Sequence, residues 1–149
     1  YYNSPTLGAL SFPLAYQSAG MIELYKLTGR KDVKANLIEC SKYVKRRLYD
    51  PKKKGFKHSP CPWRPQSTKL GGVAPNALRY VLAFDYAVTG DKQTRKIIEE
   101  NLAEMFRKKQ WYGLKRESLP DAPNPKSFTA SLYFLPHTME ILRNTEIYK

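Results

Sequence analysis

Side chains that can move a proton or neutralise a negative charge are scarce in this sequence. It contains only two histidines, His58 and His137. Histidine and tyrosine serve as general acids and bases, and arginine and asparagine stabilise negative charge. Residues of these types in loops or near the starts of expected helices are Tyr2, Tyr16, His58, Arg64, Asn76 and Arg79. Such a set suits the removal of a proton next to a carboxylate.

The histidines also have structural interpretations. His58 can be an exposed loop residue, and His137 lies in an apolar segment, where a core histidine with satisfied hydrogen bonds is the commoner case. Glycoside hydrolysis, the alternative chemistry, needs two carboxylates across the sugar bond. Asp121 lies in an expected loop, but Glu23 and Asp85 lie well along helical segments. We therefore expect no complete hydrolase site in this chain.

Three aromatic residues, Trp63, Trp111 and Tyr112, lie in expected loops. Flat aromatic faces stack on sugar rings and on nucleic-acid bases. The alternative is that these side chains pin the loops to the core. Both functions stay open at this point.

Cofactor and metal motifs are absent from the sequence. It has no Gly-rich dinucleotide motif, P-loop, His-Glu-x-x-His or Cys-x-x-Cys pattern. The two cysteines, Cys40 and Cys61, could form a disulfide, stay free, or, with His58, give a fragment of a metal site. A zinc site needs more ligands than this. We therefore expect no metal and no cofactor.

Positive charge is clustered along the chain. Lys and Arg number 26 against 13 Asp and Glu, a net charge of +13. Residues 30–57 hold eleven basic and three acidic residues, and 107–109 are all basic. Such clusters attract polyanions, although cations at helix C-termini also simply complement the helix dipole. No apolar run approaches the roughly 20 residues of a membrane span, so we expect a soluble protein.

The helices expected to position these residues occur in a repeating pattern along the sequence. The segments 24–31 and 85–92 align at a shift of 61 residues, and both contain Thr-Gly, at Gly29 and Gly90. An apolar helical pattern precedes each glycine (14–27 and 75–88), and a charged amphipathic one follows it. Glycine suits the left-handed position that closes a helix. Each copy therefore predicts an αα-hairpin with a tight turn.

Apolar stripes mark the second helix of each predicted hairpin. They consist of Val33, Leu37, Val44 and Leu48 in the first and Ile98, Leu102, Met105 and Phe106 in the second. A nearly all-apolar helix over 75–88 should be buried on every side. Glycines at 55 and 113 predict turns between short extended segments in the long connections.

A third apolar helix is expected over about 128–142. The chain then reads as two and a half hairpins, over 14–48, 75–107 and 128–145, in a single domain or part of one. Connections of roughly 20 residues in a compact domain are usually functional. The sequence opens without Met, so we expect the natural protein to begin upstream.

The pattern resembles the repeats of α/α-toroid proteins, the six-hairpin glycosidase-like group. The residues that carry the likeness are 24–31, 50–58 and 85–92. That group includes heparinase- and alginate-lyase-type polysaccharide lyases, glycoside hydrolases and sugar epimerases. The resemblance implies an all-α array of αα-hairpins, here an incomplete toroid. It also implies that substrates lie over the N-terminal ends of the first helix of each hairpin.

By this resemblance, the connections that precede those helices hold the site. Catalysis would fall to His58, Tyr2, Tyr16 and Arg64, in proton transfer or in neutralising a uronate carboxylate. The substrate would be bound by Trp63, Asn76, Arg79, Trp111, Tyr112 and Lys57.

Two functions follow from these observations. The first is a carbohydrate-active module, part of a lyase or hydrolase that cleaves an anionic polysaccharide or oligosaccharide; this would favour a secreted or periplasmic location. The second is a non-catalytic helical-repeat module that binds a polyanion, either a glycan or a nucleic acid. A convergent set of His, Tyr and Arg with spaced aromatic residues would favour the first. A continuous basic stripe without a pocket would favour the second.

Overall fold

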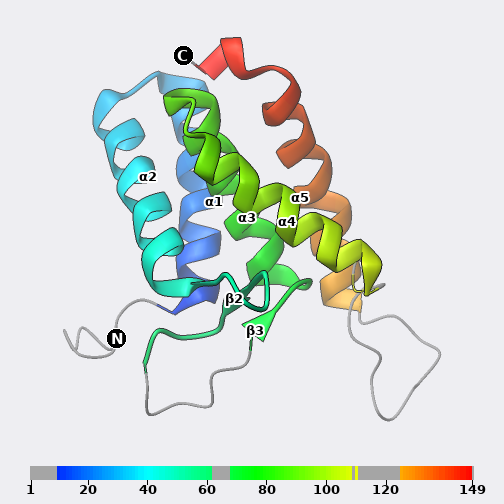
Figure 1. Ribbon diagram of the computed structural model, residues 1–149. Coiled ribbons are helices and arrows are strands. Elements are labelled where there is room, and N and C mark those ends of the chain that lie inside the picture. Colours follow the sequence, from blue (N-terminus) through cyan, green and yellow to red (C-terminus); the bar gives the residue numbers. More distant parts are fainter. Residues whose placement is uncertain (1–9, 62–67, 109, 111–124, 149) are drawn as a thin grey trace.

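The computed structural model describes residues 10–61, 68–108, 110 and 125–148, and this part of the chain is mostly helical (Figure 1). Its α-helices are α1 (Ser11–Thr28), α2 (Lys31–Tyr43), α3 (Val73–Thr89), α4 (Lys92–Arg107) and α5 (Pro125–Arg143). Its strands are β1 (Tyr49–Asp50), β2 (Gly55–Lys57) and β3 (Thr68–Lys69). A π-helical turn (Val44–Leu48) extends α2, and a 3-10 turn (Thr145–Tyr148) follows α5. Within the described ranges, no helix combines the length and apolarity needed to cross a membrane.

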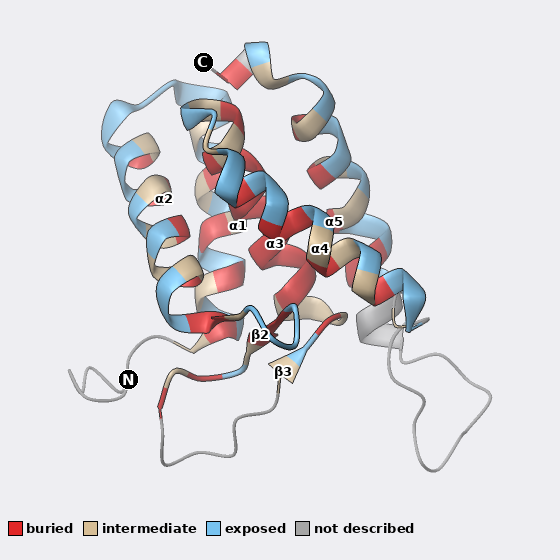
Figure 2. Cartoon of the chain, viewed as in Figure 1, coloured by how far each residue is buried: buried red, intermediate tan, exposed pale blue. Residues whose placement is uncertain are grey.

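Helix α3 is the centre of the fold. It packs against α1 and α5 most extensively, and also against α2 and α4. Figure 2 shows α3 buried along most of its length, and residues 75–85 are all buried. This confirms the expectation of a helix buried on every side. The core therefore follows α3, with the other helices packed around it.

Glycine closes α1 and α3 as the sequence predicts. Gly29 and Gly90 adopt φ angles of 64° and 71°, in the left-handed region. Their N–H groups donate to the carbonyls of Tyr25 and Tyr86, four residues earlier. The chain therefore turns at once into α2 and α4.

A pair of glycine substitutions isolates this backbone requirement. Gly20 lies inside α1, and a Cβ at Gly20 or at Gly90 would meet no atom within 4 Å. Gly90→Ala should lower the free energy of unfolding by about 1–2 kcal/mol, because alanine is strained at positive φ. Gly20→Ala should raise it by about 0.5–1 kcal/mol, because alanine favours a helix interior. Urea denaturation measures the free energy of unfolding of both variants. If both substitutions changed it in the same direction, the left-handed conformation at Gly90 would not explain the result.

A small antiparallel sheet follows α2. Tyr49 pairs with Phe56 across β1 and β2, and Phe56 pairs with Lys69 across β2 and β3. A Cβ on Gly55 would lie 2.6 Å from Thr68 Cγ2, so β3 can pair only beside a glycine. The two extended segments are confirmed, but the prediction of a turn at Gly55 is wrong, because the turn lies at residues 51–54 and Gly55 is the first residue of β2. Strand β3 was not predicted.

A cluster of charges around the buried Asp85 joins α2 and its π-helical extension to α3 and α4. Lys45 Nζ contacts Asp85 Oδ2 at 3.0 Å and Asp91 Oδ2 at 2.8 Å. Ser41 Oγ donates to the same Asp85 oxygen at 2.7 Å. Hydrogen bonds from Lys45 and Thr94 lower the pKa of Asp91 to about 2. These ionic contacts fix the C-terminal end of α3 between its neighbours.

The predicted apolar stripes are correct with one exception. Val33, Leu37, Val44, Leu48, Ile98 and Met105 are all buried, and Leu102 packs against the core. Phe106 is 48% exposed, so its assignment to the buried stripe is wrong. It follows the buried Met105 directly, and adjacent helical residues point about 100° apart.

Candidate functional site

A groove of about 780 Å³ lies between the N-terminal halves of α1 and α5, at the start of α3. We call it the aromatic groove. Its lining residues are Phe12, Tyr16, Ala19, Gly20, Glu23, Val73, Thr129, Ala130, Tyr133 and Phe134. It extends along α1 from Phe12 in the first turn to Glu23.

Half-exposed aromatic rings form the walls of this groove. Phe12 and Tyr16 are each 48% exposed and meet edge to face, with centroids 4.8 Å apart. Tyr133 contributes a third half-exposed ring from α5. The small residues Ala19 and Gly20 leave open space beside these rings. The groove therefore offers apolar ring faces to a ligand.

A carboxylate on α1 lies among these rings. Glu23 Oε1 accepts hydrogen bonds from the Tyr80 hydroxyl at 2.6 Å and from Lys26 Nζ at 3.2 Å. Burial disfavours the ionised carboxylate, but these two hydrogen bonds outweigh it, and the pKa of Glu23 lies below its usual value. Burial, and then the bond to Glu23, raise the pKa of Tyr80. Glu23 is therefore ionised, and Tyr80 is a neutral donor that orients it.

His137 lies next to this cluster. Its ring is 4.9 Å from that of Tyr133 and 5.9 Å from that of Tyr80, between centroids. Its Nδ1 is 3.6 Å from Glu140 Oε2, an ion pair that forms when the imidazole is protonated. Because its side chain is 37% exposed, the prediction of a core histidine is wrong. The face of α5 that carries Tyr133 and His137 borders solvent.

Arg79 and Asn76, two predicted substrate contacts, meet inside the protein. Arg79 is 1% exposed and donates to Asn76 Oδ1, Asn101 Oδ1 and the Leu70 carbonyl. Burial lowers the pKa of its guanidinium to about 9. Asn76 Nδ2 donates to the Gly72 carbonyl at 2.6 Å and to Ser131 Oγ at 3.1 Å. Asn76 therefore joins α3 to α5, and Arg79 joins α3 to α4 and to the segment that follows β3.

The other predicted site residues are placed as follows. Tyr16 lines the aromatic groove. His58 is exposed, Lys57 is half-buried in β2, and neither is among the described residues that line the groove. The His58 carbonyl accepts from Ser11 N–H at 3.1 Å, which joins this connection to the start of α1. Tyr2, Trp63, Arg64, Trp111 and Tyr112 lie outside the described residues.

The two cysteines and the other side chains able to bind a metal form no site among the described residues. Cys40 and Cys61 are not joined by a disulfide. Burial raises the pKa of the Cys40 thiol. Among the described residues, no group of three His, Cys, Asp or Glu side chains could hold a metal ion.

Sequence reasoning missed most of the aromatic groove. Phe12, Tyr16 and Glu23 are spaced by four and seven residues, which places them on one helix face. This spacing could have indicated from the sequence alone that the three side chains share one face of α1. The approach of α5, which brings Tyr133 to the same groove, had no local signal.

Comparisons of this chain with protein-family models, with curated proteins and with solved structures returned no match.

Proposed function

We propose that the chain is a carbohydrate-active module, part of an enzyme that cleaves an anionic polysaccharide or oligosaccharide, with sugar rings bound in the aromatic groove. The observation that carries this proposal is the set of half-exposed rings beside an ionised carboxylate. Sugars have apolar C–H faces that stack on aromatic rings, and hydroxyl groups that donate to a carboxylate.

We propose further that the helices form consecutive αα-hairpins of an incomplete α/α toroid. In support, α1, α3 and α5 lie side by side through the contacts of α3, and α2 and α4 follow tight glycine turns. In such an array, the N-terminal ends of α1 and α5 border the substrate. The aromatic groove begins in the first turn of α1, at Phe12, and extends along that helix to Glu23.

Within this groove, Glu23 is suited to binding more than to proton abstraction. Its pKa lies below the usual value, and a weaker base removes protons less efficiently. Its ionised oxygens can accept hydrogen bonds from sugar hydroxyls, while Lys26 offsets its charge. The proposed proton-transfer residues are the predicted candidates His58, Tyr2 and Tyr16, and Arg64 is the proposed group that neutralises the uronate carboxylate.

Lyase action is favoured over hydrolysis. Among the described residues that line the groove, Glu23 is the one carboxylate, whereas glycoside hydrolysis uses two. In the elimination, a base takes the proton next to the uronate carboxylate and the bond to the leaving oxygen breaks. A carbon–carbon double bond forms, and the leaving oxygen takes a proton from water.

Alanine substitutions in the groove test the binding site. Tyr16→Ala and Tyr133→Ala should each weaken binding of a uronic-acid oligosaccharide about tenfold, because each removes a stacking face. Titration calorimetry measures the dissociation constants. Phe106→Ala is the matched control, since Phe106 has the same 48% exposure as Tyr16 but does not line the groove. Equal effects of Tyr16→Ala and Phe106→Ala would contradict the site.

Cleavage is a separate question, answered by incubating the protein with uronate polysaccharides. Unsaturated ends, detected by their ultraviolet absorbance, support the lyase, and new saturated reducing ends indicate hydrolysis instead. Binding in the groove without either product would support the alternative of a non-catalytic binding module.

A further inference from the structure

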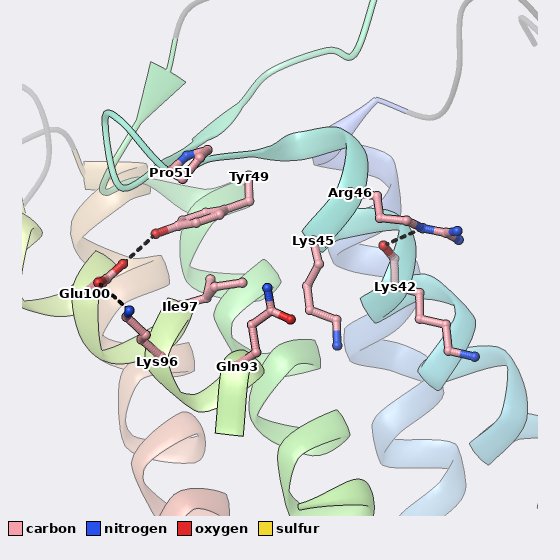
Figure 3. Close-up of a pocket in the computed structure, with 9 residues that line it drawn as sticks. All are labelled: Lys42, Lys45, Arg46, Tyr49, Pro51, Gln93, Lys96, Ile97 and Glu100. Carbon is pink, nitrogen blue, oxygen red and sulfur yellow. Dashed lines mark hydrogen bonds and ion pairs between the residues drawn. The ribbon is translucent and has the colours of Figure 1, made fainter. Parts of the chain in front are cut away.

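Two cavities outside the aromatic groove flank the turn between β1 and β2. One, of about 580 Å³, lies between the end of α2 and α4 and is shown in Figure 3. Its lining residues are Lys42, Lys45, Arg46, Tyr49, Pro51, Gln93, Lys96, Ile97 and Glu100. The other, of about 290 Å³, lies across the turn; its lining residues are Lys52, Lys53, Lys54, Thr68, Leu70, Glu104, Lys108 and Gln110. Neither shares a lining residue with the aromatic groove.

Helix α4 connects these two cavities. Lys96, Glu100, Glu104 and Lys108 are spaced by four residues, so they follow one face of the helix. The first two line one cavity and the last two line the other. The turn residues 51–54 stand between the cavities and contribute to both. We call the combined surface the basic track.

The acidic groups on the basic track are already paired. Glu104 contacts Arg107 at 2.6 Å and Lys108 at 3.2 Å. Glu100 accepts from the Tyr49 hydroxyl at 3.2 Å and lies 3.9 Å from Lys96. The basic residues outnumber these acids. The track therefore keeps an excess of positive charge for an external anion.

The backbone of the turn that carries Lys52, Lys53 and Lys54, here called the lysine turn, is fixed by side-chain hydrogen bonds. Asp50 Oδ1 accepts from the N–H groups of Lys52 and Lys53, at 3.0 and 3.2 Å. Asn101 Nδ2 donates to the Lys54 carbonyl at 2.6 Å, and Asn101 in turn accepts from the buried Arg79. Because the backbone is fixed before binding, less conformational entropy is lost when an anion engages the exposed lysines.

Lys45 has a different role from the other cations. It is committed to Asp85 and Asp91, whereas Figure 3 shows the ends of Lys42 and Arg46 directed away from the α4 wall. Lys42 pairs with Glu39 on an exposed helix face, a contact that an incoming anion can replace. The cations available to a ligand at this cavity are therefore the exposed side chains at its rim, Lys42, Arg46 and Lys96.

We propose that the basic track is a second binding site, for a sulfated polysaccharide chain that crosses the lysine turn and places anionic groups at both cavities. An extended polymer is indicated because the cations follow two cavities and the turn between them, and do not converge on one point. A glycan is favoured over a single-stranded nucleic acid because Tyr49, the only aromatic residue among the described residues that line either cavity, is buried and offers no face for base stacking.

Paired charge removals test this site with a defined dextran sulfate oligosaccharide, a sulfated glycan that contains no uronic acid. Lys52→Gln/Lys53→Gln removes charge from the turn, and Arg46→Gln/Lys96→Gln removes it from the cavity in Figure 3. Lys31→Gln/Arg143→Gln is the matched control, with the same loss of charge on exposed basic residues that line neither cavity. Dissociation constants are measured by titration calorimetry over a range of salt concentrations.

Each track pair should weaken binding about tenfold and reduce the salt dependence by roughly one to two ion contacts. The control pair should change the affinity less than about twofold, because distant exposed charges are screened. Tyr16→Ala should leave binding of the sulfated oligosaccharide unchanged, which separates this proposal from that for the aromatic groove.

Three results would overturn the proposal. Equal weakening by the track and control pairs would mean diffuse attraction to the net charge. An effect of the turn pair alone would remove the cavity of Figure 3 from the site. Tighter binding of a duplex DNA of equal length, lost in the same track variants, would show that the partner is a nucleic acid and not a glycan.

Discussion

Arg79→Met should lower the free energy of unfolding by about 3 kcal/mol. The substitution leaves the side-chain oxygens of Asn76 and Asn101 and the Leu70 carbonyl without their buried donor. Each unsatisfied buried group costs about 1–3 kcal/mol. Removing the costly buried charge recovers part of this loss, since methionine fills a similar volume without requiring hydration. The lost acceptor pairing nevertheless dominates, because three acceptors depend on one guanidinium.

A double-mutant cycle separates these contributions. Asn101→Leu removes one orphaned acceptor, so Arg79→Met/Asn101→Leu should be less destabilised than the sum of the two single variants. Arg79→Met should also speed amide hydrogen exchange in the lysine turn, because Asn101 holds the Lys54 carbonyl. Urea unfolding and hydrogen exchange provide the measurements. A neutral or stabilising Arg79→Met would show that the network is dispensable.

Asp85→Ala should cost about 3 kcal/mol, because it removes the buried acceptor shared by Ser41, Lys45 and Thr94, and hydrogen bonds to a charged group contribute about 1.5–3 kcal/mol each. The Asp85 side chain is 3% exposed and accepts from Ser41 and Lys45. Lys45, itself mostly buried, would keep Asp91 as its carboxylate partner. The three helices that meet at this point would lose their shared acceptor.

Asp91→Ala is the matched comparison for this ionic cluster. Asp91 is also bonded to Lys45, but its side chain is 35% exposed. It is the N-cap of α4 and accepts from the Gln93 N–H, a contribution of about 1 kcal/mol. We expect Asp91→Ala to cost about 1–2 kcal/mol by urea unfolding. A cost equal to that of Asp85→Ala would show that burial does not distinguish the two carboxylates.

The parts of the fold that could be predicted depend on local rules. The left-handed turns at Gly29 and Gly90 follow from backbone sterics, and the burial of α3 follows from its apolar composition. Strand β3 depends on the close approach of Thr68 to Gly55, which no pattern in residues 68–69 indicates. Local periodicity therefore predicted elements, but not which short segments pair.

The candidate site was less predictable, for physical reasons. The aromatic groove needs Tyr16 and Tyr133 on one surface, and they are far apart in the sequence. The residue type of Arg79 suggests a ligand contact, but its position on the mostly apolar α3 places it in the interior, where its N–H groups donate to protein acceptors. Of the predicted catalytic residues, Tyr16 lines the groove, while His58 lies on the strand connection. The residues of a site can be recognised by type, whereas their convergence depends on long-range packing.

The central position of α3 has a consequence for synthesis in the cell. Tyr80 and Phe134 meet where α5 covers α3, and Phe84 contacts Tyr148 beyond the end of α5. The ribosome makes α3 well before residues 125–148, so this apolar face stays uncovered while more than thirty further residues are added. A nascent chain at that stage exposes a surface prone to aggregation. Chaperone binding to this face of α3 during translation would therefore protect the nascent chain until α5 is made.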